Sequence, residues 1–170
     1  WMATPDDGLA CVAYGPCEVR AKVRGGCNVT VEVDTDYPFD ETVNMAVRMS
    51  GEAEFPLMLR IPSWAEGAML KVNGEAQTVT PGTFATVSRT WKDGDKIELY
   101  FPMNVQVERR FNDSVTIKRG PLVYSLRIGE RWEKIKGEEP HADYAVYPTT
   151  PWNYGLLIDP DNPQVEVIKK

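Results

Sequence analysis

Apolar and polar residues alternate with a period of two along most of this 170-residue sequence. Val29, Val31 and Val33, for example, are separated by Thr30 and Glu32. Similar alternation marks residues 43–49, 57–61, 97–101, 115–117 and 122–126. Successive side chains of a β-strand point to opposite faces, so this pattern predicts strands with one face on a core and the other in water. Antiparallel sheets show such alternation, whereas parallel sheets buried on both faces do not.

Turn signals separate these strands at short intervals, namely Gly25-Gly26, Asn73-Gly74, Pro81-Gly82 and Asp93-Gly94. Asn-Gly is the strongest of them, because both residues tolerate the positive φ angles of a two-residue hairpin. We therefore predict an all-β protein, an antiparallel β-sandwich of roughly ten strands. The residues expected to face inward include Val31, Val47, Leu59, Leu99, Ile117 and Leu122.

The alternation fades after Leu126, and the composition shifts toward proline, glycine, charge and aromatic rings. We therefore predict a β-sandwich domain over residues 1–128. Residues 129–170 are expected to form either an irregular tail or an incomplete second β unit, such as a truncated second sandwich. A short strand signal at residues 165–168 fits the second alternative.

Charge and composition exclude several classes of function. The net charge of -6 argues against nucleic acid and against anionic membrane surfaces as partners. No apolar run approaches the roughly 20 residues that span a bilayer, so no membrane partner is predicted. His141 is the one histidine, which rules out a multi-histidine metal site. Nothing in the sequence predicts the cellular compartment.

The cysteines and acidic pairs offer no self-contained active site. Cys11, Cys17 and Cys27 lack Cys-x-x-Cys spacing, so we expect them to bind no metal and to be small, partly buried apolar side chains. The sequence does not decide whether two of them form a single disulfide bridge. The pairs Glu52/Glu54 and Asp34/Asp36 could each share a strand face, as two catalytic carboxylates would. Both pairs flank turns, where solvated acids are normal, so no catalytic residue is predicted.

Trp152 and Tyr154 are the candidate carbohydrate-binding residues. They stand two positions apart with Asn153 between them and a proline before them. Aromatic rings on a β-sandwich can stack on sugar rings, and these two could form a small exposed platform. Packing of both rings as an anchor for the C-terminal segment is the interpretation that we favour.

Six motifs in order give the chain a family resemblance. They are Asp36-Tyr37-Pro38-Phe39-Asp40, Leu59-Arg60-Ile61-Pro62-Ser63-Trp64, Val72-Asn73-Gly74, Trp91-Lys92-Asp93-Gly94-Asp95, Leu99-Tyr100-Phe101-Pro102-Met103 and Arg119-Gly120-Pro121-Leu122-Val123-Tyr124. This series resembles the C-terminal β-sandwich region of the β-L-arabinofuranosidase-type glycoside hydrolases, family 127 and its relatives. The resemblance covers nearly the whole chain.

The resemblance implies that the chemistry of such an enzyme lies outside this chain. The family's catalytic domain is an (α/α)6 barrel whose cysteine nucleophile sits in a zinc site of cysteines and a glutamate. Those ligands lie upstream of the strand that Gly8 to Tyr14 resembles, and this sequence lacks the family's adjacent Cys-Cys pair. No catalytic residue is carried over, and zinc is expected only in the missing catalytic domain.

Two functions follow as hypotheses. The first is a non-catalytic accessory module of a glycoside hydrolase, with the missing catalytic domain of the parent enzyme as its partner. The alternative is a carbohydrate-binding module with its own sugar site, for arabinose-containing glycans. In both cases we expect the chain alone to be inactive as a glycosidase.

Overall fold

The computed structural model describes residues 1–159 and 161–168, and within them it contains 15 strands and no α-helix. The prediction of an all-β fold is therefore confirmed. The strands form four sheets within two compact units. One unit comprises residues 1–104 with 119–122 and the described residues from Val167, and the other comprises residues 105–118 with the described part of 123–166. The predicted domain boundary at residue 128 stays a prediction.

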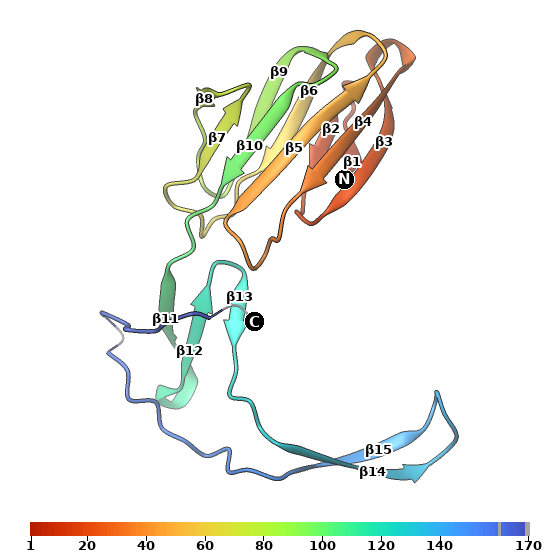
Figure 1. Cartoon of the computed structure of the whole chain (residues 1–170). Coiled ribbons are helices and arrows are strands. Elements are labelled where there is room, and N and C mark those ends of the chain that lie inside the picture. The colour runs from red at the N-terminus through yellow and green to blue at the C-terminus, as the bar shows by residue number, and fades with distance from the viewer. Residues whose placement is uncertain (160, 169–170) are drawn as a thin grey trace. The chain divides into compact units, whose positions relative to one another are not determined.

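A six-stranded antiparallel sheet forms one layer of the first unit (Figure 1). Its spatial order is β3-β4-β5-β10-β7-β8. The strands are β3 (Cys17–Val23), β4 (Cys27–Asp34), β5 (Thr42–Met49), β10 (Lys96–Tyr100), β7 (Met69–Val72) and β8 (Glu75–Gln77). A 3-10 turn at Arg24–Gly26 joins β3 to β4, so Gly25-Gly26 is a turn as predicted.

A four-stranded sheet of order β1-β2-β6-β9 forms the other layer. Its strands are β1 (Met2–Ala3), β2 (Leu9–Cys11), β6 (Glu52–Arg60) and β9 (Phe84–Lys92). The β2–β6 pair is parallel, with Leu9 opposite Leu57, whereas β1–β2 and β6–β9 are antiparallel. β2 is buried along its whole length, and its Leu9 and Cys11 belong to the core. This parallel pair departs from the purely antiparallel arrangement that the alternation predicted.

The core lies between these two sheets. Val31, Val47 and Leu99 from the larger sheet and Leu59 from the smaller one are fully buried, which confirms four of the predicted inward positions. Alternate residues of β4, β5 and β9 are buried and their neighbours are solvent-accessible, as period-two patterning requires. Ile117 and Leu122 are only half-buried, so these two inward positions were predicted wrongly: they lie on β12 (Val115–Arg119) and β13 (Leu122–Tyr124), outside the two sheets that enclose the core.

The β7–β8 hairpin turns at Asn73-Gly74, as its sequence predicted. Val72 pairs with Glu75, so the loop has two residues. Their φ angles are 53° and 83°, both in the left-handed region that favours glycine and asparagine. This turn sets the register of β8 against β7.

Replacing Gly74 by alanine is expected to lower the free energy of unfolding by about 1 kcal/mol, because a Cβ at positive φ is strained. Gly51→Ala is the matched control, since a Cβ at either glycine meets nothing within 4 Å and only Gly74 has a positive φ. Urea unfolding followed by far-UV circular dichroism measures both changes. Equal losses in the two variants would contradict the backbone explanation.

Two small sheets lie mostly in the second unit, with Arg119 at the end of β12 and Leu122 at the start of β13 belonging to the first. One has the order β11-β12-β13, from Val105–Arg109, Val115–Arg119 and Leu122–Tyr124, with a 3-10 turn at Phe111–Asp113. The other pairs β14 (Glu130–Lys136) with β15 (Asp143–Pro148). The sequence predicted either an irregular tail or an incomplete second β unit over residues 129–170, and this hairpin is the regular element that the structure has there. Residues 165–168 carry no strand despite their strand signal.

Candidate functional site

Four aromatic side chains gather at one end of the sandwich. Tyr14, Tyr37 and Trp64 surround Phe101, with ring centroids 5.3, 6.2 and 6.1 Å from the Phe101 ring. Tyr14 donates a hydrogen bond from Oη to the Arg60 carbonyl at 2.7 Å, and burial raises the pKa of its hydroxyl. The three residues around this core phenylalanine stand in separate segments of the chain, so the cluster ties the loops at this end together.

A carboxylate beside this cluster joins three segments of the chain. Glu41 Oε1 accepts hydrogen bonds from the Met103 amide at 2.8 Å and from Arg119 Nη2 at 3.3 Å, and its Oε2 accepts one from Tyr100 Oη at 2.9 Å. The hydrogen bond to Glu41 raises the pKa of the Tyr100 hydroxyl. A carboxylate accepts such charge-assisted bonds at about twice the strength of neutral ones.

Gly120 lies where only a glycine fits. A Cβ there would come within 2.8 Å of Met103 Cγ and 3.3 Å of Trp64 Cη2, and the φ angle is +56°. The Arg119-Gly120 segment therefore lies directly on Met103 and Trp64. The motif residues of separate segments thus converge on one structural cluster, and sequence reasoning did not find the Glu41–Arg119 ion pair within it.

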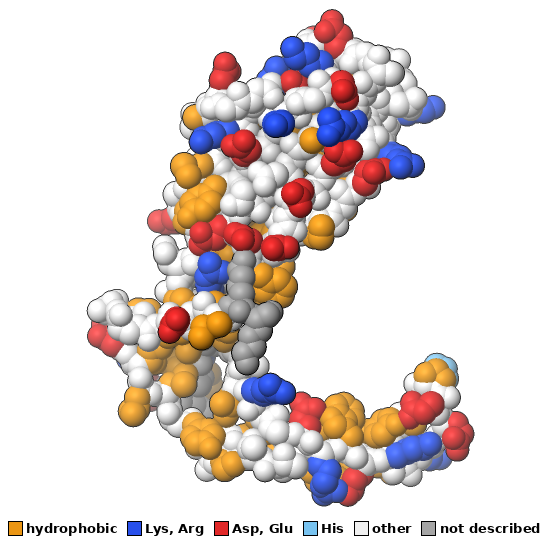
Figure 2. Space-filling view, viewed as in Figure 1, with side chains coloured by type: hydrophobic (Ala, Val, Ile, Leu, Met, Phe, Trp, Pro, Cys, Tyr) orange, Lys and Arg blue, Asp and Glu red, His pale blue; other side chains and the backbone are white. Residues whose placement is uncertain are grey.

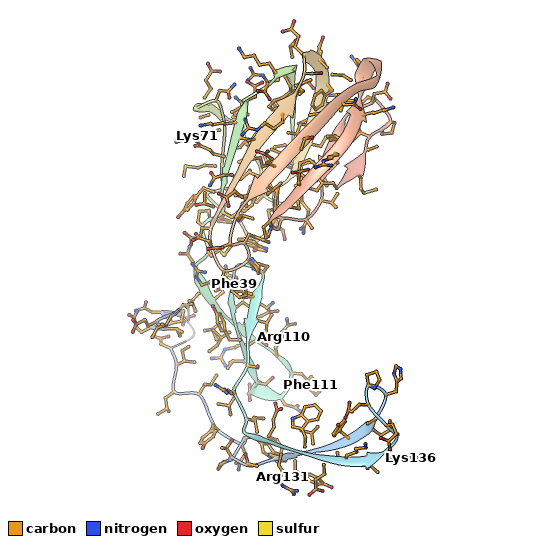
Figure 3. The ribbon with its side chains drawn as sticks, turned by 45° about the vertical axis from the view of Figure 1, so that its right-hand side comes forward. Phe39, Lys71, Arg110, Phe111, Arg131 and Lys136 are labelled. Atoms are coloured by element: carbon orange, nitrogen blue, oxygen red, sulfur yellow. The ribbon has the colours of Figure 1, made fainter. Side chains whose placement is uncertain are left out.

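The loop that carries Glu41 also presents a phenylalanine to solvent. Phe39 is 60% exposed, and Figure 3 labels it at the end of this loop. The loop is closed by hydrogen bonds from the Phe39 amide to the Asp36 carbonyl at 2.8 Å and from Thr35 Oγ1 to the Thr42 carbonyl at 2.6 Å.

The acidic side chains considered as catalytic candidates lie at the surface. Glu52, Glu54, Asp34 and Asp36 are all exposed, as expected of solvated acids. Asp95 alone among the described residues is a buried charged side chain. Its Oδ1 accepts a hydrogen bond from Asn73 Nδ2 at 2.8 Å, and its Oδ2 accepts one from the Lys92 amide at 3.0 Å. Asp95 therefore holds two turns together.

The three cysteines lie apart and carry free thiols. Cys11 is buried on β2, Cys27 is half-buried at the start of β4, and Cys17 is exposed at the start of β3, which corrects the expectation that all three are partly buried. Cys17 pairs with Val33 and Cys27 with Val23, at opposite ends of the β3–β4 ladder. Among the described residues no group of three or more histidine, cysteine or acidic side chains could hold a metal ion.

Burial raises the pKa of the Cys11 thiol from 9.0 to about 12, and the thiol hydrogen-bonds to the Ala13 carbonyl at 3.2 Å. We expect iodoacetamide at pH 8.5 to alkylate Cys17 rapidly and Cys11 only after unfolding, because the thiolate is the nucleophile. Peptide mapping by mass spectrometry measures both sites, with urea-unfolded protein as the control. Equal rates in the folded protein would refute the burial of Cys11.

The same raised pKa predicts a pH dependence of stability. Between pH 9 and 12 the Cys11 thiol stays protonated in the folded state and ionises in the unfolded state. Its contribution to stability is therefore present below pH 9 and falls by up to about 1.4 kcal/mol per pH unit above it. Between pH 8 and 10.5 the free energy of unfolding should fall less steeply with pH for Cys11→Ala than for the unchanged protein. Equal slopes in the two proteins would contradict this cause.

The two candidate sugar-binding residues are exposed. Trp152 and Tyr154 are 64% and 65% accessible, so neither is packed as the favoured interpretation expected. Trp152 lines a shallow groove with Tyr147 and Val146 of β15, and Tyr154 lies outside it. His141 is also exposed, in the turn between β14 and β15.

Beyond Met103 the described residues include no buried side chain. Many of the large exposed apolar side chains of the described residues belong to this part of the chain, and the surface in Figure 2 shows hydrophobic side chains along β14 and β15. Trp132 and Tyr144 pack edge to face on one side of this hairpin, with centroids 5.8 Å apart. In the described structure no helix is long and apolar enough to cross a membrane.

The sequence of the chain was compared with those of known protein families. The model of the β-L-arabinofuranosidase GH127 middle domain matches residues 8–103, more than half of the chain. The chain belongs to glycoside hydrolase family 127. The GH127 match includes Tyr37, Trp64 and Phe101, and it confirms the resemblance that the motifs indicated. No curated protein sequence matches the chain significantly.

Solved structures show the same fold. A GH127 β-L-arabinofuranosidase from Geobacillus stearothermophilus T6 is 23% identical with a TM-score of 0.64, over 85% of this chain and 31% of that one. A structure described as a glycoside hydrolase is 24% identical with a TM-score of 0.62, over 94% and 32% of the two chains. The GH127 β-arabinofuranosidase BT3674 is 19% identical with a TM-score of 0.63, over 85% and 29%. The chain thus spans about a third of the GH127 structures that it matches.

Proposed function

We propose that this chain is a non-catalytic β-sandwich module of a GH127-type glycoside hydrolase, and that it packs against the enzyme's remaining domains. The observation that carries the proposal is the lack of any buried residue among the described residues after Met103, together with the many exposed apolar side chains there. Soluble proteins rarely leave so much apolar surface uncovered. A larger enzyme provides the cover, because the chain corresponds to one third of its structural relatives.

The chemistry of hydrolysis belongs, in this proposal, to the catalytic barrel that the family resemblance implies. The cysteine-rich zinc site of that barrel does not fit this chain. Cys11 is buried and hydrogen-bonded to a carbonyl, and Cys17 and Cys27 stand at opposite ends of one strand pair. The residues of this chain contribute support and apolar contact surface rather than a nucleophile or metal ligands.

Assays of the 170-residue chain against a chromogenic β-L-arabinofuranoside test the non-catalytic role. We expect no turnover above the blank, and turnover abolished by changing a residue of this chain would overturn it. Packing is tested by producing the chain alone and joined to the domains that flank it in its parent enzyme. Binding of a hydrophobic dye should fall in the joined protein, whereas equal binding would contradict packing.

The second candidate function is carbohydrate binding, which the groove containing Trp152 and Tyr147 favours. Two aromatic residues in one groove, with Glu130 among its lining residues, suit the apolar face and hydroxyls of a sugar. Calorimetric titration with arabinose-containing oligosaccharides decides this question. Saturable binding lost in Trp152→Ala and retained in Tyr154→Ala would support a sugar site, and no binding by the unchanged chain would reject it.

A further inference from the structure

Residues 105–118 form a loop whose two ends meet on one carboxylate. The chain leaves the sandwich unit at Asn104 and rejoins it at Arg119. Glu41 accepts a hydrogen bond from the Met103 amide just before the exit and another from the Arg119 guanidinium at the return, both on Oε1. We propose that Glu41 acts as a latch that holds the β11–β12 hairpin closed at its base.

The latch matters because the hairpin has little else to stabilise it. None of its residues is buried, and Phe111 at its turn is 86% exposed (Figure 3). Its charged contacts, from Glu108 to Arg110 and Lys118, lie at the surface, where ion pairs contribute little. β13 pairs with β12 to complete a three-stranded sheet, but no residue of its three strands is buried. A sheet of this size needs a hydrophobic face packed on something to be stable by itself.

Glu41 is well placed to supply the missing stability. The Glu41 and Arg119 side chains are three-quarters or more shielded from solvent, so their ion pair is less weakened by water than the surface pairs. Tyr100 Oη fixes the other carboxylate oxygen, and the Phe101 amide donates to the Glu41 carbonyl at 2.8 Å. When the two ends of a loop are already held together, the strands between them can pair without the further loss of chain entropy that bringing the ends together would cost.

The latch also separates the ordering of the hairpin from the stability of the sandwich. The core of the sandwich lies between its two sheets and does not depend on residues 105–118. Opening the latch therefore frees the hairpin while the strands β4 and β5 stay folded in their sheet. The sandwich would thus carry a hairpin that one ion pair orders or releases.

Hydrogen exchange followed by mass spectrometry tests this inference on the 170-residue chain. In Arg119→Met and in Glu41→Gln we expect amides of residues 105–118 to exchange about tenfold faster, with β4 and β5 unchanged. The double variant should exchange no faster than the faster single variant, because both changes open the same latch. Glu98→Gln, an exposed acid on β10, is the matched control and should leave exchange unchanged.

Two results would overturn the latch. One is unchanged exchange of residues 105–118 in both single variants. The other is faster exchange throughout the sandwich, which would make Glu41 an ordinary stabilising residue. Because the test follows the hairpin and not enzyme assembly, it is independent of the proposed function.

Discussion

Replacing Trp91 by alanine should lower the free energy of unfolding by about 4 kcal/mol, the largest loss expected for any single change described here. Trp91 is fully buried, and it stacks near Phe55 with ring centroids 6.0 Å apart. Its indole Nε1 donates a hydrogen bond to the Phe55 carbonyl at 3.0 Å, so the change removes both packing and a buried hydrogen bond. Urea unfolding followed by far-UV circular dichroism measures the loss without relying on tryptophan fluorescence.

Trp132→Ala is the matched control for that change. The Trp132 ring is 59% exposed on β14, so its removal should change stability by less than about 1 kcal/mol. Trp91→Phe separates the contribution of ring packing from that of the hydrogen bond, because it keeps an aromatic ring but removes the Nε1 donor to the Phe55 carbonyl. A loss in Trp91→Ala no larger than in Trp132→Ala would contradict the packing described for the core.

The second large effect is expected for Asp95→Ala, at about 3 kcal/mol. The buried carboxylate accepts hydrogen bonds from Asn73 Nδ2 and from the Lys92 amide, and Arg89 Nη2 lies 4.0 Å from it. Removing the carboxylate leaves these donors without their acceptor at the ends of β7 and β9. Thermal unfolding followed by circular dichroism measures the change.

Glu98→Ala is the control. Asp95 directly precedes β10 and is buried, whereas Glu98 lies within β10 and is exposed. Glu98 is exposed on β10, so its loss should alter stability by less than about 0.5 kcal/mol. Asp95→Asn separates charge from shape, because the amide keeps the size of the side chain and loses one acceptor. If Asp95→Ala were as stable as Glu98→Ala, the hydrogen bonds of Asp95 would not be holding the turns.

The sequence predicted the sandwich well because its strands pair through local patterns. The alternation around Val31 and Val47 identified the buried faces, and Asn73-Gly74 identified a hairpin and its register. The parallel contact of Leu9 with Leu57 could not be predicted, because it joins segments 48 positions apart and no local pattern specifies such a partner.

The cluster around Glu41 shows the same limit at the level of side chains. Glu41 and Arg119 each stand in or beside a motif, yet their separation of 78 positions leaves no spacing that would reveal a pair. The sequence analysis left a second β unit open for residues 129–170 but did not identify the strands β14 and β15, for a different reason. Its residues are all solvent-accessible, so no buried face imposes the alternation from which strands were predicted.

The placement of β2 between β1 and β6 constrains how this protein can be synthesised and shortened. One edge of β2 pairs with β1, which is close to it in the chain, but its other edge has no partner until β6, 48 positions further along, has been synthesised. The smaller sheet is therefore completed late. A version beginning after Cys11 would expose one edge of β6, a nine-residue strand with an apolar centre. Unpaired edges of that kind recruit other chains, and such a version should aggregate.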